Sequence, residues 1–493
     1  MDLRPNLRSD SVVPLYRQLY EQIALKIRSG EFEPGERLPA TRELAGLLGL
    51  NRTTISAAYE MLEGEGLIAG QVGRGSFVTG KCDARPGAVA WGALLDRGAA
   101  PAMASGTAPG NAREAVSFAT SRPSRELFPL DEFRASCAAV LAREDLADIL
   151  QLGSPSGYEP LRRYLLEEAR RQQLAGDRDD LLITNGCQQA LDLIGRVLLG
   201  AGDAVIVEDP TYPGLKNLLT GLGARLIGLP VGHDGMDTAQ LARAIERERP
   251  RLIVVTPNFQ NPTGATMPVA SRLALMEAAR TGGVPVVEND PYGDLRYHGQ
   301  PLPAIKQLDD RDGTVLLRSF SKVSFPGLRV GWAVGPRPLL DRLRQAKETA
   351  DLHSDQLSQA VLLDFAESGR LEAHRQHVLA SSADRLRATL EGCRRFLPPG
   401  TRWTEPEGGM NIWVRLPDPL DAGELLARAQ REGVNYLPAR YFMISRQEPG
   451  GLRLSFAGIE PERILRGLAV LGRVVAGELA RAAAHFEPVS AMV

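Results

Sequence analysis

From about residue 114 onward, segments with helical periodicity alternate with short runs rich in β-branched residues. Three of these runs, AVIV, LIVV and VPVV, occupy positions 204–207, 252–255 and 284–287. Apolar runs of this length that alternate with helices are typical of strands buried on both faces of a parallel sheet. The alternation therefore predicts an α/β domain with a largely parallel sheet over residues 114–475.

A smaller unit is predicted over residues 12–79. Apolar residues recur every four positions on one face of a first helix, at Leu15, Leu19, Ile23 and Ile27. Gly49 ends a short second helix that is expected to bury three leucines, Leu44, Leu47 and Leu48. Asn51 is placed to cap a third helix, whose apolar face carries Ile55, Tyr59 and Leu62. Two short β runs around a glycine-rich tip at 71–78 complete the unit.

Two other stretches differ in composition from these domains. Ala, Gly and Pro dominate residues 80–113, which is typical of a linker. The Ala-rich stretch 476–493 predicts a C-terminal helix with a frayed tail. A chain of 493 residues is long enough for two or three domains, in agreement with this division.

Charge and cysteine content exclude several classes of protein. The formal net charge of -2 excludes binding of nucleic acid through bulk positive charge, so any DNA contact must come from a local surface. The four widely spaced cysteines predict neither a zinc site nor a disulfide framework, and they favour a reducing cytoplasm. No secretory signal is apparent, and no apolar stretch approaches the roughly 20 residues that cross a bilayer. We therefore expect a cytoplasmic protein with no metal site and no membrane partner.

Three motifs occur together near the N-terminus: LPATRELA at 38–45, LGLNRTT at 48–54 and GRGSFV at 73–78. With them, this segment resembles the winged helix–turn–helix of the GntR superfamily. The resemblance implies that the third helix enters the major groove of operator DNA. Donors at the helix starts and on the wing would meet phosphates and base edges. The candidate DNA-binding residues are Arg42, Asn51, Arg52, Thr53, Thr54, Arg74 and Gly75.

The unit shows one departure from the family pattern, which removes no DNA contact, and one feature that favours the alternative of an ordinary solvated surface. Ala40 stands where the family often has Ser, three residues before Glu43, so a reciprocal capping box is absent. Acidic and basic residues also nearly balance in the unit, as they would on an ordinary solvated surface.

The segment SFSKVSFPGLRVGW at 319–332 resembles the lysine motif of fold-type-I pyridoxal-phosphate enzymes, in the branch of the aminoadipate and kynurenine transaminases. The resemblance implies a large α/β domain with a mostly parallel sheet and a small α+β domain. It identifies Lys322 as the catalytic lysine that bonds to the aldehyde of pyridoxal 5'-phosphate. Ser319 and Arg329 match the family's phosphate contacts, and a guanidinium suits a phosphate dianion.

Further motifs follow the family's order. TNGCQQAL at 184–191 follows a strand and opens a helix, so its backbone amides favour an anion. This makes phosphate candidates of Gly186, Cys187 and Gln188, although the family commonly has Ser in place of the cysteine. Tyr212 matches the ring that stacks on the pyridine, and Asn261 matches a donor to its phenolic oxygen. Arg453, in GLRLSF at 451–456, matches the arginine that binds a substrate carboxylate.

The tripeptide Glu288-Asn289-Asp290 departs from the family pattern. Tyr292 matches the tyrosine on the phenolic oxygen, and three residues before it the family has an aspartate that meets the pyridine nitrogen. Here that position is Asn289, and Asp290 is the alternative partner if the strand end is shifted. The choice matters because an aspartate keeps the nitrogen protonated, whereas a neutral amide cannot. A second departure is Leu152, where relatives often have a tyrosine that reaches the partner subunit's phosphate.

The order of helix–turn–helix, linker and aminotransferase-like domain resembles the MocR branch of the GntR regulators. That resemblance implies a homodimer, operator DNA as a partner, and a cofactor site near the subunit interface. We favour a regulator that senses pyridoxal phosphate or an amine or amino-acid effector. The alternative is a working transaminase with a fused DNA-binding domain, in which Lys322 and Tyr292 are catalytic. Asn289 and Leu152 favour the sensor. A third hypothesis is that the cofactor is itself the signal.

Overall fold

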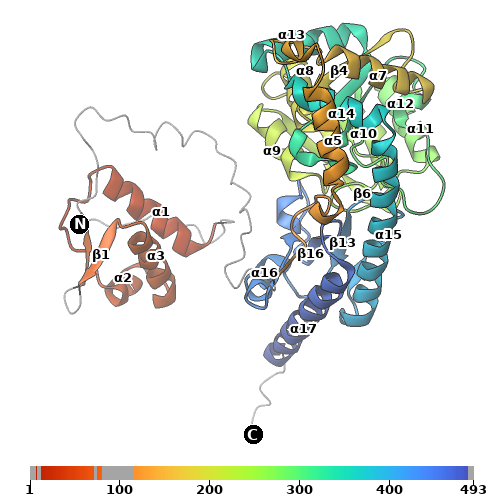
Figure 1. Cartoon of the computed structure of the whole chain (residues 1–493). Coiled ribbons are helices and arrows are strands. Elements are labelled where there is room, and N and C mark those ends of the chain that lie inside the picture. The colour runs from red at the N-terminus through yellow and green to blue at the C-terminus, as the bar shows by residue number, and fades with distance from the viewer. Residues whose placement is uncertain (1–6, 8–12, 72–74, 80–114, 487–493) are drawn as a thin grey trace. The chain divides into compact units, whose positions relative to one another are not determined.

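The computed structural model describes residue 7 and residues 13–71, 75–79 and 115–486, without the side chains of Arg42, Gln71 and residues 483–486 (Figure 1). The chain divides into two compact units, Met1–Ala99 and Ala100–Val493, and each is described by itself. The predicted linker at 80–113 and the hairpin tip at 72–74 lie outside the described residues.

The N-terminal unit has three helices and a hairpin, in the order predicted. Its elements are α1 Leu15–Arg28, α2 Thr41–Leu48, α3 Arg52–Gly64, β1 Ile68–Gln71 and β2 Gly75–Val78. The predicted apolar faces meet in one core that includes Leu19, Ile23, Leu44, Ile55 and Leu62. Because the unit is small, this single cluster supplies most of the apolar burial that holds the helices together.

The ends of the short helices follow local chemistry. Gly49 ends α2 in the left-handed conformation, with φ 65°. Asn51 caps α3, because its side chain accepts a hydrogen bond of 3.2 Å from the Thr53 amide. Ala40 precedes α2 without any side-chain cap, as the missing capping box predicts.

One predicted core residue was wrong. Leu47 is 70% exposed, whereas Leu44 is fully buried. The helix α2 has only two turns, and the inward direction lies between Leu44, Ala45 and Leu48, which leaves Leu47 on its outer flank.

Gly75 begins β2 with a φ of +105°, a conformation that side chains with a Cβ rarely adopt. We expect Gly75→Val to destabilise the hairpin by about 1–3 kcal/mol, because the strain remains whatever space the side chain finds. Faster hydrogen exchange of the β1 and β2 amides is the measurement. Gly46→Ala is the matched control, since a Cβ there meets nothing within 4 Å. Unchanged exchange in the Gly75 variant would contradict the assigned turn.

The C-terminal unit contains an eight-stranded sheet in the order β4-β11-β10-β9-β8-β5-β6-β7. All its strands are parallel except β11 and β7, which run antiparallel to their neighbours. Two of the three β-branched runs, 204–207 and 252–255, lie in β5 and β8, and the third, 284–287, overlaps the start of β9. The strands are β4 Asp179–Thr184, β5 Ala204–Asp209, β6 Arg225–Gly232, β7 Gly235–Met236, β8 Leu252–Val255, β9 Val286–Asn289, β10 Thr314–Ser319 and β11 Gly331–Pro336.

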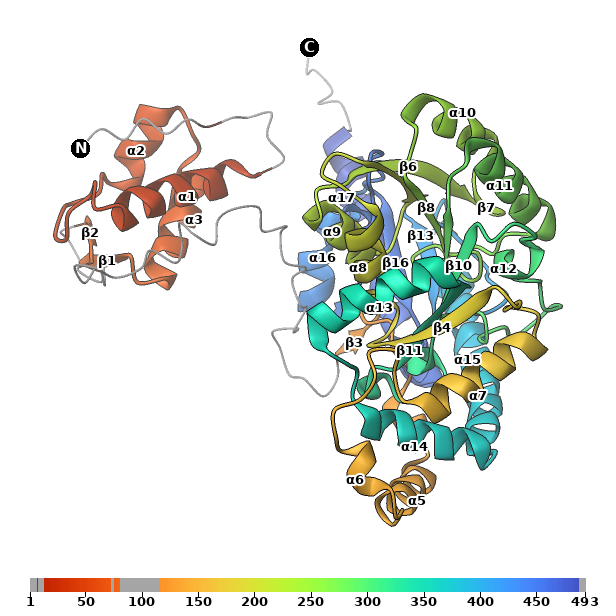
Figure 2. The same cartoon turned by 90° about the horizontal axis from the view of Figure 1, so that it is seen from above.

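Helices cover both faces of this sheet (Figure 2). One face packs against α8 Cys187–Leu198, α9 Pro213–Gly221 and α13 Arg337–Asp351. The other face packs against α7 Glu159–Arg171, α10 Thr238–Glu248, α11 Val269–Gly282 and α14 Gln356–Glu367, with α5 Leu130–Leu141 outside α14. Because successive strand residues point to opposite faces, Leu181 and Ile183 join the core under α7, whereas Leu182 joins the core under α8.

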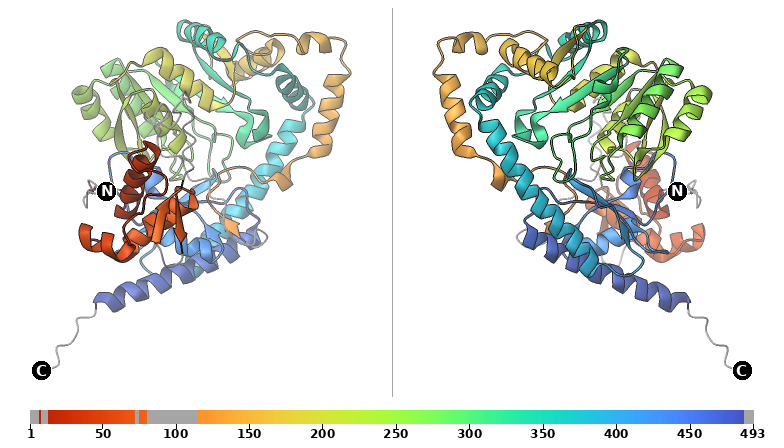
Figure 3. Two further views of the ribbon diagram at one scale, coloured as in Figure 1. Left: turned by 90° about the vertical axis from the view of Figure 1, so that its left-hand side faces the viewer. Right: turned by 90° about the vertical axis from the view of Figure 1, so that its right-hand side faces the viewer.

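A second, smaller domain is built on an antiparallel sheet in the order β12-β13-β16-β15. Its strands are β12 Arg402–Trp403, β13 Asn411–Arg415, β15 Leu437–Pro438 and β16 Gly451–Ser455. The long helix α15 Arg370–Phe396 enters this domain and packs against α17 Pro461–Phe486 (Figure 3). The helix α16 Ala422–Arg431 also packs against α17. A large α/β domain and a small α+β domain are therefore both present, as the resemblance implies.

The predicted division at residue 475 cuts through a regular element. The helix α17 is continuous from Pro461 to Phe486, because its buried apolar side chains, Leu468, Leu471 and Val475 among them, carry on the small domain's core. The expected tail beyond 486 lies outside the described residues.

Candidate cofactor site and DNA-binding helix

The loops that follow five parallel strands meet at one edge of the large sheet. They come after β4, β5, β8, β9 and β10, and the carboxyl edge of a parallel sheet is where such folds bind ligands. A cavity of about 540 Å³ lies there. It is lined by ten of the residues predicted from sequence: Cys187, Gln188, Tyr212, Asn261, Asn289, Tyr292, Ser319, Lys322, Arg329 and Arg453.

Lys322 ends a 3-10 turn, Phe320–Lys322, that follows β10 directly. Its Nζ donates a hydrogen bond of 3.2 Å to the carbonyl oxygen of Ser121 and lies 5.6 Å from the centre of the Tyr292 ring. Burial lowers the pKa of the Lys322 amine to about 8. A larger fraction of this amine is therefore neutral near pH 7 than for an ordinary lysine, as bond formation with an aldehyde requires.

Arg329, Gly186 and the first residues of α8 form a site suited to an anion, called the anion cradle below. The Arg329 guanidinium donates to the Ser321 hydroxyl and to the Asn185 carbonyl, each at 3.2 Å. Gly186 has a φ of +78°, and a Cβ there would lie 2.5 Å from the Arg329 guanidinium, so only glycine permits this approach. Next to it begins α8, whose first amides have no acceptor within the helix.

Cys187 is the first residue of α8. Burial raises the pKa of its thiol to about 12, so the side chain stays neutral. A thiol is a weaker hydrogen-bond donor than the serine hydroxyl that the family commonly has here.

A chain of hydrogen bonds crosses the cavity from β16 to Tyr292. Arg453 donates to the Asn261 Oδ1 at 3.1 Å, and the Asn261 Nδ2 donates to the Tyr292 hydroxyl at 3.3 Å. Burial lowers the pKa of Arg453 to about 10. On the other side of the cavity Tyr212 packs so closely over Gly214 that a Cβ there would lie 2.4 Å from its ring.

The structure separates Asn289 from Asp290. Asn289 is the last residue of β9 and lines the cavity, and its Oδ1 is buried with no hydrogen-bond partner among the described residues. Asp290 points away, where it accepts a hydrogen bond of 3.0 Å from Asn258 and pairs with Arg318 at 3.3 Å. The two side chains differ because neighbouring residues of an extended chain point to opposite sides.

Sequence reasoning missed the segment that closes the cavity opposite Lys322. Ala119, Thr120 and Ser121 follow β3 Val116–Ser117 and line the cavity together with Thr256 and Leu437. Ser121 contacts Lys322 through its backbone carbonyl, which every residue type has, so no motif could reveal it. Leu152 does not line the cavity and is 73% exposed.

The predicted DNA-binding residues lie mostly at the start of α3. Asn51, Arg52 and Thr53 are exposed there, and Thr54 is half-buried. Gly75 is in β2. Arg74 and the side chain of Arg42 lie outside the described residues.

Among the described residues, no cluster of His, Cys, Asp or Glu has the form of a metal site, and Cys137, Cys187 and Cys393 are free thiols. None of the helices that the structure describes is long and apolar enough to cross a membrane.

The cavity residues fit pyridoxal 5'-phosphate. A buried amine, an anion cradle and the side-chain amide of Asn289 correspond to its aldehyde, its phosphate and its ring nitrogen. The aminotransferase class I and II family matches residues 131–471, and the gntR family of bacterial regulatory proteins matches residues 15–78.

Three relatives each cover about three quarters of the chain or more. The probable rhizopine catabolism regulatory protein MocR of Rhizobium meliloti is 31% identical over 94% of each chain. The 2-aminoadipate transaminase of Thermus thermophilus is 37% identical over 74% of this chain and 91% of its own. The kynurenine aminotransferase of Pyrococcus horikoshii has a solved structure with a TM-score of 0.72 and 35% identity, covering 74% of this chain and 92% of its own.

A winged helix–turn–helix joined to a fold-type-I aminotransferase domain defines a class of DNA-binding transcription regulators. This chain belongs to the MocR-type branch of the GntR regulators, because it matches a regulator of that kind over nearly its whole length. The resemblance stated from the motifs is thereby confirmed. Its cofactor is pyridoxal 5'-phosphate, which the fold family and the donor set of the cavity both imply.

Proposed function

We propose that this regulator senses a small amine or amino acid through pyridoxal phosphate at Lys322, and that occupancy of the site changes its affinity for operator DNA. The observation that carries the proposal is Asn289, whose amide occupies the cavity where the family places an aspartate. A site that binds amines but turns them over slowly is suited to sensing, since the ligand persists long enough to shift a conformational equilibrium.

Most of the predicted residues would have a part in holding the cofactor or its ligand. Ser319, Arg329 and the start of α8, with Gly186, Cys187 and Gln188, would bind the phosphate. Tyr212 would stack on the ring, while Asn261 and Tyr292 would donate to the phenolic oxygen. Arg453 would bind the carboxylate of an amino-acid effector. When bound, the cofactor supplies an aldehyde that condenses with amines and a ring that can accept electrons.

The side chain of Asn289 would limit the rate at which a bound amine is turned over. An aspartate at this position would keep the ring nitrogen protonated, and a protonated ring stabilises the negative charge that develops when a neighbouring C–H bond is broken. An amide carries no charge and cannot hold the proton in this way. The proposed consequence is slow turnover. Asp290, the alternative partner, pairs with Arg318 and is directed away from the cavity.

A working transaminase remains the second candidate. Lys322, Tyr292, Asn261 and Arg453 all line the same cavity, which favours it. The regulators that match this chain over nearly its full length, MocR and the Rhodobacter capsulatus regulator TauR, favour the first candidate.

Titration of the cofactor-loaded protein with primary amines and amino acids tests the proposal. We expect one class of amine to change both the cofactor's absorption and the operator affinity, by about five-fold or more. Catalytic consumption of the amine with no change in operator affinity would instead support the transaminase.

We further propose a homodimer that acts in the cytoplasm and places its two α3 helices in successive major grooves of the operator. Aminotransferases of this family are typically dimeric, and paired half-sites about one helical turn apart would match two-fold symmetry.

Arg52→Ala is expected to weaken operator binding by about 1–3 kcal/mol and relax sequence preference, if Arg52 reads a base. If Arg52 contacts only phosphate, specific and non-specific affinity fall together. The slope of the logarithm of the binding constant against the logarithm of the salt concentration then becomes shallower by about one. Binding titrations over a range of salt concentrations distinguish these cases. The control is Arg17→Ala, because Arg17 is an exposed arginine on a different helix, α1. Unchanged binding to both DNA types would show that α3 is not the recognition helix.

A further inference from the structure

The carboxylate of Asp351, the last residue of α13, is a junction between three side chains. Its Oδ1 accepts a hydrogen bond of 2.8 Å from Lys347, one turn earlier in the same helix. Its Oδ2 accepts from the amide of Asn185 at 3.0 Å and from the amide of Gln189 at 2.5 Å. Asp351 itself does not line the cofactor cavity.

The two side-chain amides that Asp351 holds flank the segment that forms the anion cradle, Asn185 just before α8 and Gln189 in its first turn. Asn185 and Gln189 lie on either side of the Gly186–Gln188 segment, and the backbone N–H of Asn185 donates to the Gln189 Oε1 at 2.8 Å. The Asn185 carbonyl in turn accepts from Arg329. Both groups that would bind the phosphate, the start of α8 and Arg329, are therefore connected to Asp351 through Asn185 and Gln189.

Stability alone does not account for this arrangement. The Lys347 side chain is fully buried, and burial lowers the pKa of its amine. Pairing a buried lysine with a carboxylate that is 23% exposed gives little net stability, because the desolvation of the lysine opposes the attraction between the two charges. The pair does fix the orientation of the Asp351 carboxylate, since Lys347 binds one carboxylate oxygen and leaves the other for the two side-chain amides.

The backbone at Asp351 is also held in an uncommon conformation. Leu352 has φ 61° and ψ -62°, and the His353 amide donates to the Asp351 carbonyl at 2.7 Å, which closes a tight three-residue turn. The Leu352 side chain is 60% exposed, so its own packing does not hold the turn. Such strain persists only where surrounding contacts fix it, and the side-chain contacts of Asp351 lie directly beside it.

From these contacts we propose that Asp351 is a positioning residue for the cofactor phosphate. It sets the shape of the cradle through Asn185 and Gln189, and Lys347 orients it. The proposal rests on the function proposed above only in assigning the phosphate to this cradle.

The test compares pyridoxal phosphate with pyridoxal, which lacks the phosphate. The dissociation constant of each is measured for the full chain by absorbance or fluorescence. The dissociation constant of pyridoxal divided by that of pyridoxal phosphate is the affinity ratio, which isolates the contribution of the phosphate. Two variants are used, Asp351→Ala and Gln189→Met, the second of which leaves no buried charge unpaired. We expect the ratio to fall about ten-fold or more in each, while pyridoxal binding stays within about two-fold. A general loss of structure would instead lower the affinity for both ligands together and leave the ratio unchanged.

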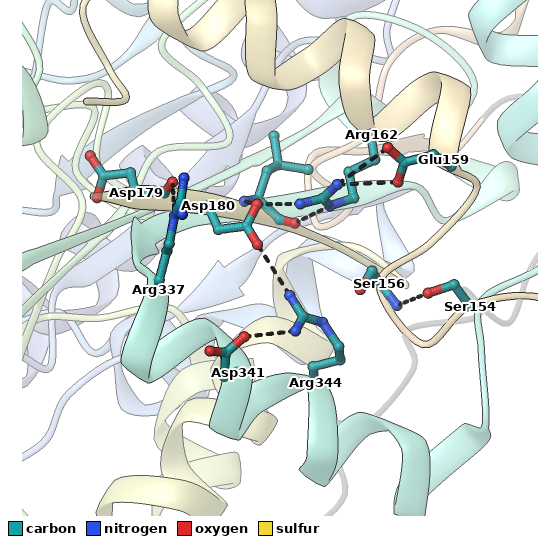
Figure 4. Close-up of polar contacts among 10 residues, drawn as sticks. Ser154, Ser156, Glu159, Arg162, Asp179, Asp180, Arg337, Asp341 and Arg344 are labelled. Atoms are coloured by element: carbon teal, nitrogen blue, oxygen red, sulfur yellow. Dashed lines mark hydrogen bonds and ion pairs between the residues drawn. The ribbon is translucent and has the colours of Figure 1, made fainter. Parts of the chain in front are cut away.

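Asp341→Asn is a matched control on the same helix. Asp341 pairs with Arg344 at 2.7 Å, and Arg344 also reaches Asp180 of β4 at 3.1 Å (Figure 4). None of these three residues lines the cofactor cavity. The affinity ratio of the Asp341→Asn variant should equal that of the wild type. The double variant Lys347→Met with Asp351→Asn keeps an acceptor for the two amides without an unpaired cation, and should recover most of the ratio lost in Asp351→Ala.

A wild-type ratio in both Asp351→Ala and Gln189→Met would overturn the proposal, even if the cofactor binds as expected. If Asp351→Ala does not fold, Gln189→Met alone decides. Equal affinity of the wild type for both ligands would overturn the proposal together with the assignment of the phosphate site, so the two failures are distinguishable.

Discussion

Lys322→Ala is expected to abolish covalent attachment of the cofactor and with it the visible absorption of the lysine-bound form. No other described lysine lines the cavity, so no nearby amine is placed to substitute. The fold should persist, because the phosphate cradle does not use the amine. Borohydride reduction of the wild type followed by peptide mapping should find the modified residue at 322.

The pH dependence of this attachment has a definite sign. Burial lowers the pKa of Lys322 to about 8, and only the neutral amine attacks an aldehyde. The rate of attachment to the cofactor-free protein should therefore rise as the pH increases through about 8, and level off above it. Lys216→Ala is the control, since its amine donates to the Met443 carbonyl outside the cavity. A reduced adduct on any lysine other than 322 would refute the assignment of the cofactor lysine.

Asn289→Asp is expected to raise the rate of half-transamination at least ten-fold. A carboxylate facing the ring nitrogen would keep it protonated, and each 1.4 kcal/mol gained in stabilising the transition state gives about a factor of ten in rate. The measurement is the single-turnover conversion of bound pyridoxal phosphate to pyridoxamine phosphate with an amino acid. Asp290→Asn is the matched variant and should change this rate little, because Asp290 pairs with Arg318 outside the cavity.

The reverse pattern has an equally clear meaning. If Asp290→Asn stops the reaction and Asn289→Asp gives no gain, Asp290 is the partner of the ring nitrogen. The main reason to prefer a sensor over a transaminase would then be lost, while the family, the fold and the DNA-binding unit would be unaffected.

Features that depend on a few consecutive residues could be predicted from the sequence. Gly49 and Asn51 mark the ends of α2 and α3 because capping acts within one turn of helix. The β-branched runs identify β5, β8 and β9 because a strand buried on both faces must be apolar throughout. The motif around Lys322 predicts which lysine holds the cofactor, because the motif is a short run of consecutive residues in and after the turn that follows β10; this assignment stays a prediction.

Features that depend on packing between distant segments were decided only by the tertiary structure. Sequence alone left both Asn289 and Asp290 as partners of the ring nitrogen, and the direction of each side chain follows from how β9 is seated in the sheet. Leu47 fits the pattern of a buried leucine but lies on the outer flank of α2. Ser121 and Asp351 reach the site from 201 and 166 residues away along the chain, to Lys322 and Asn185 respectively. Contacts over such distances arise from the arrangement of elements, and no local pattern encodes them.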